Sequence, residues 1–315
     1  MDNKHLLRFL GFAFAIGWLC MGIACAVGFE SKGRPWLLLA MWAPLAAALL
    51  AGSQTRRTLW TRMKKAAWWF WPGALAVGAS FAVGQQLLLT ALAEGHWNSS
   101  LFRLNAHGSG IDSIHHVLMV LGAGQQSWPF FALNLLLSLS VGSVMTMALG
   151  TIGEEGGWRG VLQIELQRRF GLIKGTLLTG LIWGYWHLPI NLAGLNDVHH
   201  PVLEALVIFP LLAVSMSLLL AWLLNRSGSI WPGALAHSAN NTVYACMIIS
   251  PVGWLADQGT AVVVAIVIGG LFAWLLGKDA KRTSHSQPES SPHHLSDCLG
   301  VVSPPPATIG VPDAT

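Results

Sequence analysis

The stretch Ala261–Leu276, AVVVAIVIGGLFAWLL, decides the class of fold, because it has no charged side chain over nearly the length of a membrane crossing. The whole chain shares this character: of its 315 residues, 53% are hydrophobic and 10% are charged. Soluble domains carry about 25% charged residues, because their surface must meet water. Lipid must therefore solvate much of the chain, which excludes a soluble enzyme, a disordered scaffold and a secreted disulfide-rich domain. The formal net charge of +4 is too small to indicate a nucleic-acid partner.

Other apolar stretches also reach the length of about 17–25 residues that a membrane-spanning helix needs. Together with the first, the predicted spans are 9–28, 36–52, 66–92, 130–150, 175–193, 203–224, 229–250 and 260–277. We therefore predict an all-α polytopic membrane bundle of about eight transmembrane helices, formed by residues 1–277. Residues 278–315 are rich in Ser, Pro and His, a composition that cannot bury enough apolar surface to fold, so we expect a disordered cytoplasmic tail.

The distribution of basic residues predicts the orientation in the membrane, because Lys and Arg are enriched in cytoplasmic loops. With eight spans, fifteen of the 18 Lys and Arg residues fall on one side, and Lys32, Arg34 and Arg103 fall on the other. Both termini are therefore expected in the cytoplasm. We expect a multi-pass integral membrane protein, located in the plasma (inner) membrane of a bacterium.

The first apolar stretch leaves an alternative open. Lys4 and Arg8 precede it, and Ala24–Ala26 has the small residues of a cleavage site, so the stretch could also be a signal peptide. We favour a retained helix, because the apolar run of a signal peptide is usually shorter, about 7–15 residues.

Very few ionisable residues fall within the predicted spans, and each of these is a functional candidate. An ionisable group at membrane depth is costly unless it is paired or faces a wet interior. Of the 12 His residues, His187 and His237 alone lie inside an apolar stretch. Of the acids, Glu154 and Glu155 follow a long apolar run, and Arg159 comes soon after them.

The spacing of these residues predicts which of them share a helix face. If the helix of 130–150 continues inward, Glu155 and Arg159 form an i,i+4 ion pair in the favoured order. Glu154 then points about 100° away and stays available as a base. Trp183 lies one turn before His187 and places an aromatic wall beside the imidazole.

A second pair with the same spacing is formed by His237 and Asn241, whose two donors could converge on one oxygen atom. Each feature also has an ordinary interpretation: a helical ion pair at the membrane edge, or a histidine hydrogen-bonded between helices. The glycines near the acidic pair are expected to allow close helix packing. They are Gly153, Gly156, Gly157 and Gly160.

Taken together, three motifs resemble those of the CAAX-processing and bacteriocin-processing (CPBP, or Abi) intramembrane protease family, which includes the type II CAAX prenyl endopeptidases. They are Glu-Glu-x-x-x-Arg at 154–159, aromatic-x-x-x-His at 183–187 and His-x-x-x-Asn at 237–241. Each is weak alone, but all three occur in order inside or beside apolar stretches. The resemblance covers a family core of about 130–250.

The resemblance implies a peptide hydrolase whose site faces the cytosolic half of the membrane. Glu154 would be the general base that takes a proton from water, assisted by His187. His237 and Asn241 would donate hydrogen bonds to the developing oxyanion.

The remaining motif residues have supporting roles in this family. Glu155 and Arg159 would fix the helix that presents the catalytic acid. Trp183 and Trp158 depart from the family pattern, since many members carry Phe there, but an indole keeps the aromatic wall.

A metal-dependent mechanism is the alternative. Glu154, His187 and His237 could hold a divalent metal, zinc first among the candidates, with a bound water as the nucleophile. Against this, the sequence has no His-Glu-x-x-His motif, and the ligands would come from three separate helices. The residues leave both mechanisms open, and we favour the metal-free one.

The leading functional hypothesis is therefore an intramembrane endopeptidase. Its partners would be membrane lipid and a peptide or membrane-protein substrate, including one that carries a lipid, with no nucleic acid. One alternative is a non-catalytic immunity or assembly factor with the protease fold. Another is a proton-coupled transporter, which the lack of recognisable repeats disfavours. The oligomeric state stays open.

Overall fold

The computed structural model describes residues 1–29, 32–92, 102–104, 111–113, 120–122, 124–246 and 254–285. Its α-helices and π-helical turns (η) follow in chain order. They are α1 (Asn3–Val27), α2 (Arg34–Leu50), α3 (Ser53–Arg62), α4 (Phe70–Leu92), α5 (Trp128–Thr146), η2 (Met147–Thr151), α6 (Ile152–Gly157), η3 (Trp158–Leu162), α7 (Gln163–Phe170), α8 (Leu172–Trp186), α9 (Leu188–Leu192), α10 (Pro201–Leu203), η4 (Glu204–Ile208), α11 (Phe209–Ser227), α12 (Ile230–Cys246) and α13 (Trp254–His285).

The predicted all-α class is confirmed, with one small addition between α4 and α5. Three short strands form an antiparallel sheet in the order β1-β2-β3. They are β1 (Phe102–Leu104), β2 (Ile111–Ser113) and β3 (Gly124–Gln126).

The predicted number of eight spans is not confirmed. Each predicted apolar stretch contains a helix, but within the described residues five helices are long and apolar enough to cross a membrane. The number rises to six if α2 and α3, which meet at a bend of 118°, count as one broken span. The helix α8 has 15 residues. At about 1.5 Å per residue it falls short of a hydrocarbon core of about 30 Å, which a hydropathy pattern alone does not reveal.

The segment Trp128–Phe170 is a continuous helical stretch of 43 residues. The helix of 130–150 thus continues through the Glu-Glu pair to Phe170, as the spacing of Glu155 and Arg159 required. Two π-helical turns, η2 and η3, lie on either side of α6, which carries the Glu-Glu pair. Such turns are rare in proteins as a whole, but many of those that occur lie at functional sites. They widen the helix and change the direction of its side chains.

Close packing of α2 against α6 fixes the position of the Glu-Glu pair. A Cβ atom added at Gly157 would lie 2.3 Å from Cβ of Pro44, and one added at Gly153 would lie 2.7 Å from the carbonyl oxygen of Met41. No side chain can therefore fit between the two backbones at these positions. The predicted packing role of these glycines is confirmed.

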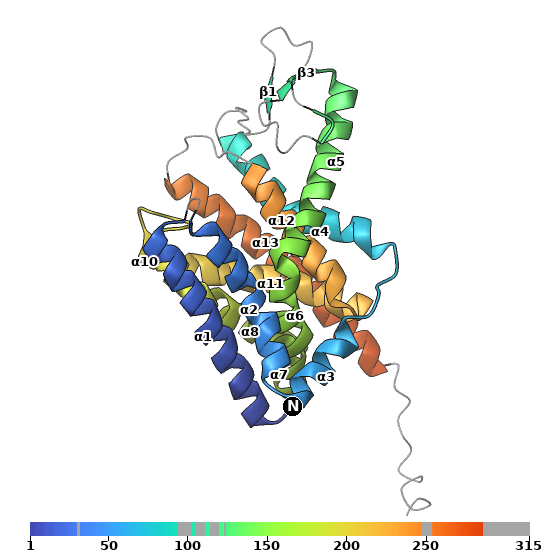
Figure 1. Ribbon diagram of the computed structural model, residues 1–315. Coiled ribbons are helices and arrows are strands. Elements are labelled where there is room, and N and C mark those ends of the chain that lie inside the picture. The colour runs from blue at the N-terminus through green and yellow to red at the C-terminus, as the bar shows by residue number, and fades with distance from the viewer. Residues whose placement is uncertain are drawn as a thin grey trace, which may run out of the picture. The chain divides into compact units, whose positions relative to one another are not determined.

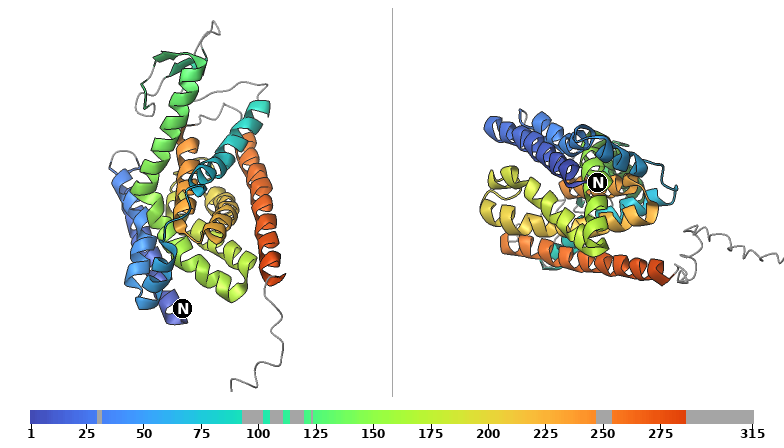
Figure 2. Two further views of the ribbon diagram at one scale, coloured as in Figure 1. Left: turned by 90° about the vertical axis from the view of Figure 1, so that its right-hand side faces the viewer. Right: turned by 90° about the horizontal axis from the view of Figure 1, so that it is seen from below.

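The long helices of residues 1–278 surround α11 and α12 (Figures 1 and 2). The neighbours α1 and α2 lie side by side on one flank, whereas α13 lies on the opposite flank. α13 packs on α11, since the rings of Phe272 and Trp222 lie 5.3 Å apart. The helix continues to His285, so it extends beyond the predicted start of the tail at 278, through good helix formers such as Ala280 and Lys281. The rest of the predicted tail, 286–315, lies outside the described residues.

Candidate active site

The carboxyl group of Glu154 is buried and hydrogen-bonded to an indole. Its side chain comes from α6 and is 3% exposed. Nε1 of Trp183, from α8, donates to Oε2 of Glu154 over 2.7 Å. The residue expected to form an aromatic wall is therefore also a hydrogen-bond partner of the predicted base.

Glu155, one residue further along α6, connects three helices. Its Oε1 accepts from Nη1 of Arg159 at 3.1 Å, which is the predicted i,i+4 ion pair, and both side chains are buried. The same oxygen lies 2.9 Å from Nδ1 of His237 in α12. Arg159 in turn donates through Nη2 to Oγ of Ser217 in α11, at 2.8 Å. Glu154 and Glu155 therefore face different partners, as expected for consecutive residues that are turned by about 100° about the helix axis.

The ring nitrogens of His237 and His187 can be assigned from these contacts. Nδ1 of His187 lies 2.9 Å from the carbonyl oxygen of Trp183, which can only accept, so Nδ1 carries the hydrogen. Nε2 of the neutral His187 ring is then an acceptor. In His237, Nδ1 likewise donates its hydrogen bond to Oε1 of Glu155, the oxygen that also accepts from Arg159. Nε2 of His237 can therefore donate only when both ring nitrogens carry a hydrogen.

Trp183 contacts four of the other candidates, which are Glu154, Arg159, His187 and His237. Its ring lies 5.1 Å from the ring of His237 and 5.8 Å from that of His187. The guanidinium carbon of Arg159 lies 4.3 Å from the same ring, a cation–π contact. Through Trp183, the structure brings together the candidates from α6, η3, α8 and α12.

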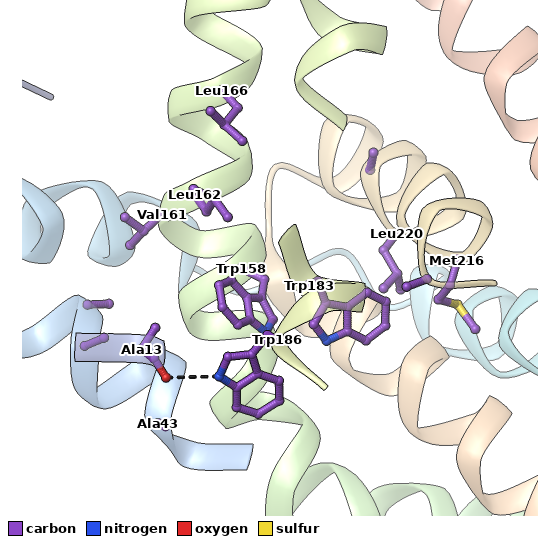
Figure 3. Close-up of a cluster of buried hydrophobic side chains, with 14 of the residues drawn as sticks. Ala13, Ala43, Trp158, Val161, Leu162, Leu166, Trp183, Trp186, Met216 and Leu220 are labelled. Atoms are coloured by element: carbon purple, nitrogen blue, oxygen red, sulfur yellow. Dashed lines mark hydrogen bonds between the residues drawn. The ribbon is translucent and has the colours of Figure 1, made fainter. Parts of the chain in front are cut away.

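Further aromatic side chains enclose this group of residues. The rings of Trp158 and Trp186 lie 5.7 Å apart, and Figure 3 shows them beside Trp183. Trp186 donates from Nε1 to the carbonyl oxygen of Ala13, so α1 holds the end of α8. The ring of His187 contacts Trp186 at 4.8 Å and Phe209 at 4.7 Å.

Hydroxyl groups hold α12 against the helix of the Glu-Glu pair, close to His237. Oγ1 of Thr151 donates to the carbonyl oxygen of Ala234 at 3.1 Å, and Oγ of Ser238 donates to that of Ser143. These contacts fix His237, which is 5% exposed, opposite Glu155.

Asn241 lies one helical turn after His237 and is half-buried. Among the described residues, its amide makes no hydrogen bond with the other candidates. The position of the Asn241 side chain relative to His237 therefore follows from their spacing in α12.

The arrangement of the acidic and imidazole side chains bears on the metal-dependent alternative. Among the described residues, no group of three or more His, Cys, Asp and Glu side chains is arranged to hold a metal ion. Glu154, His187 and His237 contact a common indole, but they do not form a ligand set as placed. The arrangement therefore does not fit the metal-dependent alternative, and the chemistry below uses the side chains alone.

Several residues that contact the candidate site could not be recognised in the sequence. Ser217, which binds Arg159, is a hydroxyl residue in an apolar helix, and a search limited to ionisable groups passes over it. Trp186 and Phe209 look like ordinary core residues in the sequence. A search for every polar residue inside apolar stretches would have found Ser217.

Comparisons with known proteins support the same region. Residues 135–243 match the model of the family described as Type II CAAX prenyl endopeptidase Rce1-like. The chain is also similar to CAAX prenyl protease 2 of Methanococcus maripaludis, with 26% identity over 127 residues, which are 39% of this chain and 46% of that protein. The chain therefore matches about half the length of this curated relative.

The long apolar helices, together with this match, indicate an integral membrane protein. Residues 135–243 are therefore similar to the Rce1-like type II CAAX prenyl endopeptidase family, in agreement with the resemblance inferred from the three motifs. The matched segment contains every candidate residue from Glu154 to Asn241.

Proposed function

We propose that the protein is an intramembrane endopeptidase that hydrolyses a peptide bond of a membrane-associated substrate, including one that carries a lipid. The observation that carries this proposal is the buried hydrogen bond between Trp183 and Glu154, in contact with His187 and His237. A carboxylate in a protein interior, next to two imidazoles, suits proton transfer to and from a reacting water molecule.

Glu154 acts as the general base in this proposal. Trp183 holds its Oε2, which leaves Oε1 to take a proton from water as the water attacks the scissile carbonyl. Nε2 of His187 is an acceptor and can orient the same water. The proton on Glu154 then passes to the leaving amine, so that the carboxylate is regenerated.

His237 and Asn241 stabilise the oxyanion that forms on the carbonyl oxygen. A lost donor of this kind costs about 2.7–4 kcal/mol in the transition state. His237 contributes in the form that carries both ring hydrogens, with Nδ1 held by Glu155 and Nε2 directed to the oxyanion. Glu155 and Arg159 act as positioning residues for this arrangement.

The proposed site lies in the cytosolic half of the membrane. His237 follows the start of α12 at Ile230 by two helical turns, about 10 Å at the usual rise per residue. We propose that this end of α12, which follows Arg226, faces the cytoplasm, and that the membrane is the plasma (inner) membrane of a bacterium. A substrate held by a lipid anchor would present its peptide at this depth.

A comparison of new terminal peptides tests the proposal. Membranes that contain the wild type or Glu154→Gln, which keeps size and hydrogen bonding but removes the base, are compared for peptides that depend on the active protein. The rate of their formation should fall by about 10²-fold to 10⁴-fold, as is usual for the loss of a general base.

The control is Glu204→Gln, which changes another buried carboxylate, at the start of η4. It should cleave at the wild-type rate. Equal cleavage by wild type and Glu154→Gln would contradict the proposal. It would favour the non-catalytic immunity or assembly factor, in which the motif residues serve packing.

A further inference from the structure

We propose that the helix of the Glu-Glu pair carries a binding site for a short chain of water molecules, which supplies the hydrolytic water. The inference rests on the proposed hydrolytic function and adds a route for its second substrate. The route runs along one face of α6, η3 and α7, from Gln167 through Gln163 and Arg159 to Glu155.

The first observation is a row of polar atoms without partners. Within the described residues, Oε2 of Glu155, Nε of Arg159 and both side-chain atoms of Gln163 are buried and lack a protein hydrogen-bond partner. The three side chains are between 0 and 1% exposed. They follow each other four residues apart, and residues with this spacing lie on neighbouring turns of one face. Of ten such atoms in the described part of the chain, four belong to this row.

The energetic cost of this row makes partners necessary. A buried donor or acceptor without a partner loses the hydrogen bonds that it makes to water in the unfolded chain, and this destabilises the fold. Buried water molecules typically satisfy such groups with about three hydrogen bonds each. Because Gln163 presents both a donor and an acceptor, it can bind one water on either side and continue the chain.

The row has polar neighbours on the helices that face it. Arg159 is bound to Ser217, and a Cβ atom added at Gly180 would lie 3.0 Å from Oγ of Ser217, so α8 is close at this level. The neighbouring Thr179 is fully buried, and its hydroxyl, which donates to Gly175, keeps lone pairs that can accept from water.

The row also leads to the end of the helix that is expected in the cytoplasm. Gln167, one turn beyond Gln163, is half-buried and donates to Oγ1 of Thr176 at 2.9 Å. The next residue, Arg168, has a side chain that is 60% exposed. Because the hydrocarbon core holds no water of its own, a hydrolase within it needs such a route.

Variants of Gln163 test the inference. Gln163→Met keeps the length of the side chain and removes both hydrogen-bonding groups. It should lower kcat by about 10-fold to 100-fold with an unaltered KM, because the water and not the peptide is affected. Gln163→Asn, which keeps the amide, should recover most of the loss. Thr179→Val, a milder change on α8, should lower kcat in the same sense and serves if Gln163→Met does not fold.

The control is Trp222→Phe, which removes one of the buried unpartnered atoms that lie outside the row. It should leave kcat unchanged. A wild-type kcat in Gln163→Met and Thr179→Val would overturn the inference.

A second measurement does not depend on activity. An experimental structure of the wild type that resolves water should show an ordered water within hydrogen-bond distance of the Gln163 amide. The absence of ordered water at the Gln163 amide in such a structure would overturn the inference, even if Glu154→Gln is inactive. Ordered water in the row with an active Glu154→Gln would instead contradict the proposed function and leave the water site standing.

Discussion

The indole of Trp183 donates a hydrogen bond of 2.7 Å to Glu154, and the face of the same ring carries the guanidinium of Arg159 at 4.3 Å. One side chain therefore positions both the proposed base and the cation that neutralises its neighbour Glu155. This relationship separates the donor function of the indole from the packing function of the ring, so the two can be tested apart.

Trp183→Phe should retain the aromatic wall and lose the hydrogen bond to Glu154. Hydrogen bonds to charged groups contribute about 1.5–3 kcal/mol, so kcat should fall by about 10-fold to 100-fold. Trp231→Phe, which removes an indole donor to the carbonyl oxygen of Met63, is the control and should keep full activity. An unaltered kcat in Trp183→Phe would show that the bond does not position the base.

Glu155→Gln should affect stability far more than Glu154→Gln does. Removing one partner of a buried ion pair costs about 3–5 kcal/mol, because Arg159 would remain buried without its counter-charge. The melting temperatures of both variants in detergent should differ accordingly, with Glu154→Gln close to the wild type. Equal melting temperatures would mean that Arg159 finds another partner.

The donor role of His237 can be separated from its volume. His237→Gln keeps an N–H group within reach of the oxyanion, whereas His237→Ala removes every donor. The second should lose about 10²-fold to 10³-fold in kcat, as for other oxyanion donors, and the first should lose clearly less. Equal losses would assign His237 to proton transfer instead.

Gly157→Ala should destabilise the fold. The added Cβ would lie 2.3 Å from Cβ of Pro44, and such overpacking costs about 1–3 kcal/mol. Gly11→Ala, where no atom lies within 4 Å of the added Cβ, is the matched control and should melt at the wild-type temperature or above. A stable Gly157→Ala would show that α2 can move away from α6 at little cost.

Asp197 in the loop before α10 should make stability depend on pH. Burial raises the pKa of its carboxyl group, but hydrogen bonds from Trp254 and from the backbone N–H groups of His199 and His200, with the charge of His200, together hold the pKa below the ordinary value of 3.8. Asp197 therefore stabilises the protein above pH 3.8, and this contribution is lost as the pH falls through the lower folded pKa. The difference in melting temperature between the wild type and Asp197→Asn should shrink as the pH falls below 3.8. A difference that does not change with pH would contradict this assignment.

Local features of the site could be predicted from the sequence. The ion pair of Glu155 and Arg159 depends on spacing within one helix, which the structure confirms. The close approach of Gly157 to another helix also follows from residue size alone. Helix periodicity fixes both, because neither depends on where distant segments pack.

Contacts between distant segments could not be predicted in the same way. The bond between Glu155 and His237 joins residues 82 positions apart, and nothing in either motif specifies it. The donor role of Trp183 depends on how α8 is turned relative to α6. The number of eight spans is not confirmed for a related reason: hydropathy reports apolar length, whereas α8 ends at Trp186 because the chain turns at His187 and Pro189.

The close approach of Gly157 to Pro44 leaves no space for side chains between α2 and α6, the helix that carries the two carboxylates. Tightly packed interiors transmit displacement instead of absorbing it. A change in the tilt of α2, such as a thinner or thicker bilayer could impose, would therefore displace the backbone that carries Glu154 and Glu155. Bilayer thickness would then act on the alignment of these two carboxylates through the contact of two helices, without any lipid entering the site.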